Sequence, residues 1–408
     1  MEPLILVRWV NFAATLTAGG TIWFALLMPR PLPPVLAARL RALVLAALAV
    51  TALSGAVWLA LVAADVLGVS LRGLTAAGAW SVVTDTRFGQ VAAARLVLAL
   101  LLAALTPWPR TRPAQGLLAL GLVALPALTG HAGALPGPSG YGLIAVDMAH
   151  LLAAGAWLGG LPAFLLALQR TPDDWEAGDR LVRTTRRFSR LAFLAVATLL
   201  GTGLINSAFL LSGPGDLLAS DYGRRLGLKL VLFAAMLAFA AANRFRLTPA
   251  LPGGGARRSL ARNTLIETAL GVGILAVVAT LGTLPPPRHA HSASAAIPDD
   301  AAFVHIHTTE AMADVLIEPG NAGRSSVTAR LWSDDMSELP ARAVTIVLEP
   351  PKNSACPSSE QSATRQADGA WRINNIDCTQ KGPWTVRLVI TPRDGSKLLL
   401  VAPIVIAR

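Results

Sequence analysis

The sequence HAGALPGPSGYGLIAVDMAHLLAAGAWLGGLP, residues 131–162, decides how this chain is organised. It connects the end of one apolar segment to the start of the next through a turn rich in glycine and proline. The second apolar segment carries Asp147 and His150, which are three residues apart and therefore share one face of a helix. Ionisable residues inside an apolar span are costly, so they generally line a cavity or bind a ligand.

The same segment also carries a signal for close helix packing. Gly155, Gly159 and Gly160 follow His150 and allow the backbone of a neighbouring helix to approach. Trp157 lies seven residues after His150 and returns to the same helix face. The segment is therefore expected to pack against another helix along one side while it presents its polar pair.

The composition is that of a polytopic membrane protein. Of the 408 residues, 53% are hydrophobic and 14% are charged, and the mean hydropathy is +0.54. Residues 1–284 contain 23 Lys/Arg and 11 Asp/Glu, whereas the rest of the chain contains 12 and 13. The net charge of +11 therefore belongs to the apolar part, where it sets the orientation in the membrane and gives no reason to expect a nucleic-acid partner.

Eight segments are long enough to cross a bilayer, for which about 20 apolar residues are needed. They are residues 4–28, 42–64, 89–106, 115–130, 141–168, 189–211, 224–243 and 264–284. The fourth segment is the shortest of them. The sequence thus predicts an all-α polytopic membrane domain of about eight helices over residues 1–284.

The charges and the cysteines predict the same orientation. The loops after the first, third, fifth and seventh segments are rich in arginine, so the positive-inside rule makes them cytoplasmic. Both termini of this inner-membrane protein are then periplasmic. Cys356 and Cys378 lie 22 residues apart in the polar C-terminal region and fit one disulfide in an oxidising compartment.

The C-terminal part has the pattern of a separate β domain. Residues 285–300 form a linker rich in proline, alanine and serine. Residues 301–408 contain short stretches in which apolar and polar residues alternate, which predicts a small all-β sandwich. These stretches are residues 303–308, 313–319, 325–332, 342–350, 369–374, 384–392 and 397–407.

Polar residues of the membrane segments gather toward the predicted outer surface. His131 stands at the outer mouth, and Asp147 and His150 lie below it. The outer halves of other spans contain Arg8, Asn11, Arg95, Asn206 and Lys229, whereas Glu267 lies near the inner end of the last span. This distribution is expected for a site that opens to the periplasm, and snorkelling of arginine and lysine to lipid headgroups is the alternative.

Histidine and carboxylate ligands suit Cu(II), whereas thioethers suit Cu(I). His131, Asp147 and His150 are therefore candidate copper ligands. Two alternatives stay open. The Asp147–His150 pair could only join helices, or His131 and His150 could hold a haem in a membrane redox protein.

The C-terminal domain offers a second pair of candidate ligands. His305 and His307 alternate along the first predicted strand, so their side chains point to the same side. Two adjacent imidazoles form half of a Cu(II) site, and the alternative is the exposed polar face of an edge strand.

Several stretches resemble the CopD family of copper resistance and copper import membrane proteins. They are TRFGQVAAARLVLAL (residues 86–100), GHAGA, DMAHLLAAGAWLGGL and YGRRLGLKLVLFAAMLAFAAANR (residues 222–244). The C-terminal stretches HIHTTEAMADV, DGAW and GPW resemble a β-sandwich module comparable to the periplasmic copper carrier CopC. The resemblance implies movement of copper between periplasm and cytoplasm, or copper handling at the outer face.

These observations lead to one expectation. The chain is a copper-transporting or copper-handling protein and not an enzyme, in contact with membrane lipid, copper ions and a periplasmic copper carrier. His305 and His307 capture copper, and His131, Asp147 and His150 accept it in the membrane. Because protons compete with copper for imidazole, uptake should weaken as the pH falls through about 6.5. A protein that only senses copper or donates it to another enzyme is a further alternative.

Overall fold

The structure is a computed structural model. It describes residues 2–67, 69–130, 137–170, 175–211, 213, 215–253, 255–284, 298, 300–308, 311–333, 338–350, 356–378, 382–393 and 397–406. Within these ranges, the side chains of residues 2, 137–139, 170, 175–177, 219, 253, 307, 377, 378 and 383 lie outside the description. The chain forms two compact units, Met1–Arg288 and His289–Arg408.

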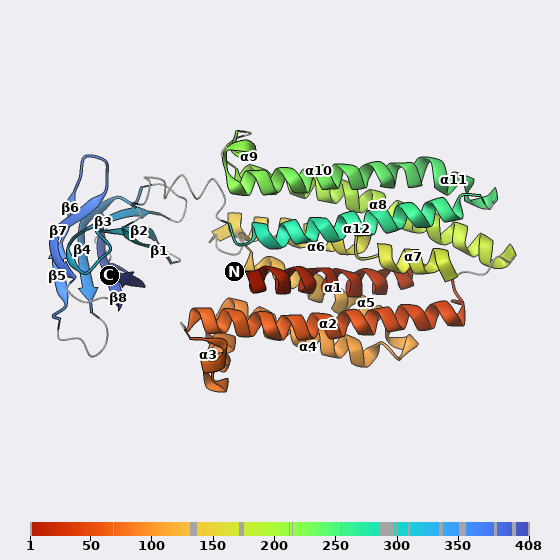
Figure 1. The fold of residues 1–408 in the computed structure, drawn as a ribbon, viewed down its shortest axis with the longest axis horizontal. Coiled ribbons are helices and arrows are strands. Elements are labelled where there is room, and N and C mark those ends of the chain that lie inside the picture. The colour runs from red at the N-terminus through yellow and green to blue at the C-terminus, as the bar shows by residue number, and fades with distance from the viewer. Residues whose placement is uncertain are drawn as a thin grey trace. The chain divides into compact units, whose positions relative to one another are not determined.

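The first unit is a bundle of helices that run side by side (Figure 1). The longer helices are α1 (Glu2–Leu27), α2 (Pro34–Val66), α4 (Arg87–Leu105), α5 (Arg112–Ala124), α6 (Gly137–Trp157), α7 (Leu161–Arg170), α8 (Trp175–Leu210), α10 (Asp221–Ala242) and α12 (Arg257–Leu281). The shorter elements include α3 (Ala76–Asp85), η3 (Leu125–Thr129), α9 (Asp216–Ala219), the π-helical η5 (Asn243–Leu247) and α11 (Thr248–Ala250). Among the described residues, seven helices are long and apolar enough to cross a membrane, with α6 and α7 counted as one. The predicted all-α polytopic domain is confirmed.

The predicted fourth span is the segment that differs from the others. Residues 115–130 form the end of α5 and the 3₁₀ helix η3, and α5 has only 13 residues. At 1.5 Å per residue it extends about 20 Å, less than the hydrocarbon core of a bilayer. Pro126 lacks a backbone N–H, so it cannot continue the α-helical hydrogen bonding past Ala124. α5 packs against α1, α4 and α6 inside the bundle and, together with η3, is the candidate eighth helix.

The predicted fifth span, residues 141–168, is two helices and not one. α6 ends at Trp157 and α7 begins at Leu161, with a turn between them. A Cβ on Gly159 would lie 1.9 Å from the carbonyl oxygen of Leu16, and one on Gly20 would lie 2.2 Å from the carbonyl carbon of Gly159. The two backbones are therefore in direct contact. The close helix neighbour predicted from the glycines is confirmed, and it is α1.

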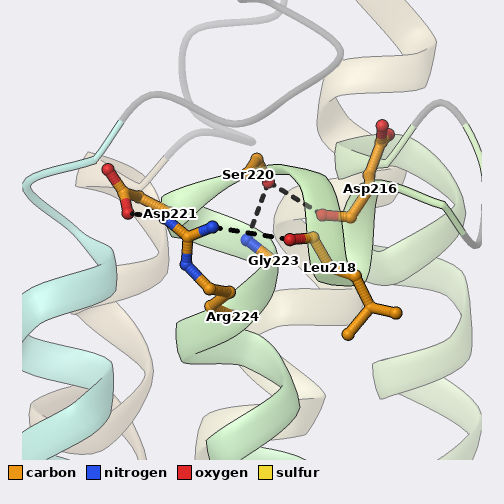
Figure 2. Close-up of polar contacts among 6 residues, drawn as sticks. All are labelled: Asp216, Leu218, Ser220, Asp221, Gly223 and Arg224. Atoms are coloured by element: carbon orange, nitrogen blue, oxygen red, sulfur yellow. Dashed lines mark hydrogen bonds and ion pairs between the residues drawn. The ribbon is translucent and has the colours of Figure 1, made fainter.

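The start of α10 explains the glycine of the Tyr222–Gly223 pair. Ser220 is the N-cap, and its Oγ accepts a hydrogen bond from the backbone N–H of Gly223 at 2.9 Å (Figure 2). The same hydroxyl donates to the carbonyl oxygen of Asp216 at 2.9 Å, which ties α9 to α10. A Cβ on Gly223 would lie 1.9 Å from that carbonyl oxygen, so only glycine fits at this corner.

The second unit is built from antiparallel strands in two sheets. The strands are β1 (Ala302–His307), β2 (Met312–Glu318), β3 (Gly323–Trp332), β4 (Ala341–Glu349), β5 (Ser359–Ser362), β6 (Thr364–Arg365), β7 (Trp371–Cys378), β8 (Gly382–Pro392) and β9 (Leu398–Ile406). One sheet has the order β1-β2-β3-β7-β6 and the other β5-β4-β8-β9. Buried side chains from both sheets form one core, with Val315 and Val327 from the first and Trp384 and Leu388 from the second. The predicted all-β sandwich is confirmed.

All seven predicted stretches overlap observed strands. The burial alternates along β3, whereas most of β2 is buried without alternation. β5 and β6 were not predicted. They are short and polar, and each lies at an edge of its sheet, where neither face needs to be apolar.

Candidate functional site

The two polar residues of α6 both contact α8. The Nδ2 of Asn206 donates a hydrogen bond to Oδ1 of Asp147 at 2.6 Å. One turn deeper along the helix pair, Nδ1 of His150 lies 2.8 Å from Oγ1 of Thr202. The shared face predicted for Asp147 and His150 thus points at one neighbouring helix, which holds both side chains in place.

The hydrogen bonds of Thr202 assign the tautomer of His150. The Thr202 hydroxyl donates its proton to the carbonyl oxygen of Thr198 at 2.7 Å, so Oγ1 can only accept from the imidazole. His150 therefore carries its proton on Nδ1 and has an unprotonated Nε2. That nitrogen is the atom through which a neutral imidazole binds a metal ion.

α10 supplies a cation to this cluster. Lys229 interacts electrostatically with Asp147 and His150, and Tyr222, at the start of the same helix, interacts with Asp147. Because lysine carries a compact positive charge, it can balance the charge of the carboxylate. Asn206, Thr202 and Lys229 complete the cluster around the predicted pair.

Gly130, the residue before His131, lies next to this cluster. A Cβ on Gly130 would lie 3.7 Å from Oδ2 of Asp147, so the backbone at the end of η3 faces the carboxylate. His131 is the next residue in the sequence and lies outside the described residues. Among the described residues, no group of three or more His, Cys, Asp or Glu side chains is placed to hold a metal ion. Asp147 and His150 are therefore two candidate ligands that need a third from elsewhere.

A second buried acid lies nearer the opposite end of the bundle. Glu267 of α12 is 3% exposed, and its Oε1 accepts a hydrogen bond from Asn243 at the start of the π-helical η5. It lines a cavity of about 40 Å³, and Trp157 of α6 is one of the cavity walls. The cavity offers oxygen and nitrogen atoms of hard character together with Arg244, so it does not resemble a copper site.

The β unit holds one of its two predicted histidine ligands within the described side chains. Nδ1 of His305 lies 2.5 Å from Oδ1 of Asp314 on β2, directly across the β1–β2 pair, and half of the His305 side chain is exposed. The backbone of His307 belongs to β1, but its side chain lies outside the described residues. The side chain of Cys378 does so too, and the predicted disulfide with Cys356 stays a prediction.

Sequence reasoning found Asp147, His150, Asn206 and Lys229 as polar residues of their spans but did not find Thr202. A threonine in a membrane helix bonds its own helix backbone in most cases, so its side chain carries no signal in the sequence. Only the packing of α8 against α6 reveals that its hydroxyl also meets an imidazole.

The fold and the cluster define a polytopic membrane protein with a buried polar site between its helices and a β domain at its C-terminal side. Two family models match this chain. Residues 1–141 match the copper resistance protein D-like N-terminal domain, and residues 182–281 match copper resistance protein D. Thr202, Asn206 and Lys229 lie inside the second match, whereas Asp147 and His150 lie between the two.

The chain belongs to the copper resistance protein D family. It is 30% identical over 288 residues to the inner membrane protein YebZ of Escherichia coli (strain K12), an alignment that covers 69% of this chain and 98% of YebZ. It is 36% identical over 183 residues to copper resistance protein D of Pseudomonas syringae pv. tomato, covering 42% of this chain and 59% of that protein. It is 26% identical over 276 residues to the copper transport protein CutJ of Bacillus subtilis (strain 168), covering 66% of this chain.

The chain spans 47% of the length of CutJ, about half of that relative. No solved structure matches the chain.

Proposed function

We propose that this chain carries copper across the inner membrane and accepts it at the cluster of Asp147 and His150. The observation that supports this function is the hydrogen bond from His150 to Thr202, which leaves Nε2 of a fixed imidazole ready for a metal ion. The carboxylate of Asp147 lies one turn away on the same face, and the chain that leads to His131 faces it. His131 is the third ligand in this proposal. The named relatives, a copper transport protein and a copper resistance protein, favour copper over other cations.

The experiment for this function compares the copper content of cells that contain the chain with cells that lack it, at equal growth and equal external copper. A difference in either direction supports copper transport, and its sign gives the direction. Equal contents contradict transport and favour a sensor or a copper donor. A Soret band in the visible spectrum of the purified protein would instead favour haem ligation by His131 and His150.

The proposed orientation puts both termini in the periplasm. A reporter fused after Arg408 is expected to behave as periplasmic. A reporter inserted between α7 and α8 is expected to behave as cytoplasmic, because the arginine-rich run predicted as a loop forms the first part of α8, and positively charged segments stay inside. Alkaline phosphatase and green fluorescent protein fusions measure the two sides independently. The reverse pattern at either position would overturn the orientation and the proposed side of copper entry.

The β unit is proposed to capture copper at His305 and His307. Replacing both with alanine is expected to lower Cu(II) binding to the β unit by about 10-fold or more, because two imidazoles are lost together. Asp314, which contacts His305, acts as the partner that orients its ring. Binding is measured by titration of the parent and the variant with Cu(II). The exposed His305 side chain makes the double change compatible with an unchanged circular dichroism spectrum, and unaltered Cu(II) binding would assign the pair a structural role.

A further inference from the structure

The two halves of the helical unit repeat one motif at a helix start. α4 begins with the N-cap Thr86 and has Gly89 three residues later, and α10 begins with Ser220 and Gly223 in the same positions. In both, the glycine lies against the backbone of a short preceding helix. A Cβ on Gly89 would lie 2.1 Å from the carbonyl oxygen of Val82 in α3. Six residues after each glycine stands a cation followed by Leu-Val-Leu, Arg95 in α4 and Lys229 in α10.

The first helices of the two halves correspond as well. LILVRWVN (residues 4–11) in α1 aligns with LIAVDMAH (residues 143–150) in α6, which pairs Arg8 with Asp147 and Asn11 with His150. Their contacts correspond too. Nδ2 of Asn11 donates to Oγ of Ser54 on α2 at 3.0 Å, as His150 meets the Thr202 hydroxyl on α8. α2 and α8 are therefore counterparts, and each follows its first helix in the chain.

The end of the last helix in each half faces the first helix of the other half. At the end of η3, which follows α5, Gly130 faces Asp147 of the second half. At the end of α12, Gly282 faces Arg8 of the first half, and a Cβ there would meet its guanidinium. This reciprocal exchange is the signature of two-fold symmetry. The backbone contact between Gly20 of α1 and Gly159, in the turn after α6, joins equivalent positions of the two halves and so lies at the axis.

The arrangement of helices agrees with this symmetry. In Figure 1, α2 and α4 lie on one side of α1, and α8 and α10 lie beyond α12 on the other side. The four helices of the first half are α1, α2, α4 and α5, and those of the second are α6 with α7, α8, α10 and α12. With four helices each, the two halves cross the membrane in the same direction, as parallel repeats do.

The counterpart of the candidate copper site has a different charge. Where the second half has Asp147 and His150, the first half has Arg8 and Asn11, and no copper ligand replaces them. Arg95 is 7% exposed, and its Nη2 donates to Oδ1 of Asn11 at 2.7 Å and to Oγ1 of Thr15 at 3.0 Å. Both contacts are to neutral groups. Within the described part of the chain, no carboxylate pairs with Arg8 or Arg95.

The guanidinium of Arg95 lacks one hydrogen-bond acceptor in the described structure. Its Nε is buried without a hydrogen-bond partner in the described structure, and the side chain lines a cavity of about 20 Å³. Asn11 and Thr129 contribute polar atoms to the cavity, and Trp58 and Phe88 contribute aromatic walls. That volume holds one particle of about the size of water. A buried guanidinium without a counter-charge is costly, so a monatomic anion fits the charge and the space.

We propose that the helical unit consists of two copies of one four-helix repeat, and that the first copy binds chloride at Arg95 where the second copy offers its copper site. The chloride lies in this cavity beside the buried guanidinium of Arg95 and balances its charge, while Nδ2 of Asn11 keeps its hydrogen bonds to Thr51 and Ser54. The site lies in the other half of the unit from Asp147 and His150, and its occupation does not depend on the proposed copper function. The anion fixes the guanidinium and holds α1, α2 and α4 together.

The test is binding of radioactive chloride to the purified full-length chain in detergent, measured by equilibrium dialysis against gluconate. The parent is expected to bind one equivalent. Arg95→Gln is expected to weaken binding by at least about 10-fold, the equivalent of one charge-assisted hydrogen bond. Lys229→Gln, the counterpart change in the second repeat, is the matched control and should bind chloride like the parent.

A folding readout accompanies the binding. Thermal unfolding of the parent should shift to higher temperature when chloride replaces gluconate, and the shift should be absent in Arg95→Gln. If Arg95→Gln does not fold, Arg95→Lys keeps the charge and should retain chloride binding at reduced affinity. A parent that binds no chloride, or a Lys229→Gln variant that loses it equally, would overturn the proposal, whatever the outcome for copper.

Discussion

Replacing His150 with alanine is expected to reduce copper accumulation to the level of cells that lack the chain. The change removes the imidazole whose Nδ1–H is fixed by Thr202 and whose Nε2 is the proposed copper ligand. Asp147→Asn is expected to weaken accumulation by about 10–100-fold, because the amide keeps the shape of the carboxylate but loses its charge. The measurement is cellular copper at matched membrane levels of each variant.

Thr202→Val separates orientation from ligation. Valine keeps the shape of threonine but cannot accept the Nδ1–H of His150, so accumulation should fall by about 10–100-fold, as for other groups that orient a ligand. Thr198→Val is the matched control one turn away on α8, because the Thr198 hydroxyl donates to the carbonyl oxygen of Leu194 in its own helix. Parent-like accumulation by His150→Ala would move the site elsewhere and leave the Asp147–His150 pair as helix-joining groups. A similar loss for Thr198→Val would instead indicate damage to helix packing.

Replacing Gly159 with alanine is expected to unfold or misassemble the helical unit. The new Cβ would lie 1.9 Å from the carbonyl oxygen of Leu16, and backbone cannot move aside as a flexible side chain can. Overpacking of a tight interior costs about 1–3 kcal/mol, and a clash between two backbones at the centre of the bundle should reach at least the upper value. The readout is thermal unfolding of the purified protein and its yield from the membrane.

The control for this prediction is Gly203→Ala on α8. Nothing lies within 4 Å of a Cβ at Gly203, so the change should leave stability the same or raise it by up to about 1 kcal/mol through helix propensity. A parent-like melting temperature for Gly159→Ala would show that α1 and α6 do not pack through their glycines. It would also remove the contact at the proposed symmetry axis.

The sequence by itself determined the class of the protein and the kind of each element. Long apolar segments predict membrane helices, because an apolar span of about 20 residues has few other stable forms. Alternation with a period of two predicted the strands of the β unit, since one face of each strand lies on the core. The pair of Asp147 and His150 was readable because ionisable groups stand out in an apolar helix.

Only the tertiary structure decided which groups meet. α6 ends at Trp157 because the turn at Gly159 contacts α1. The hydropathy of the sequence continues across residues 158–160 and therefore gives no sign of that contact. The contact of His150 with Thr202 and that of Arg95 with Asn11 likewise depend on which helices are neighbours. Lipid tails and helix surfaces are equally apolar, so a membrane sequence does not mark which of its faces meets protein. The correspondence of Arg95 with Lys229 is visible in the amino-acid sequence. The reciprocal contacts of the folded helices give this correspondence a physical meaning.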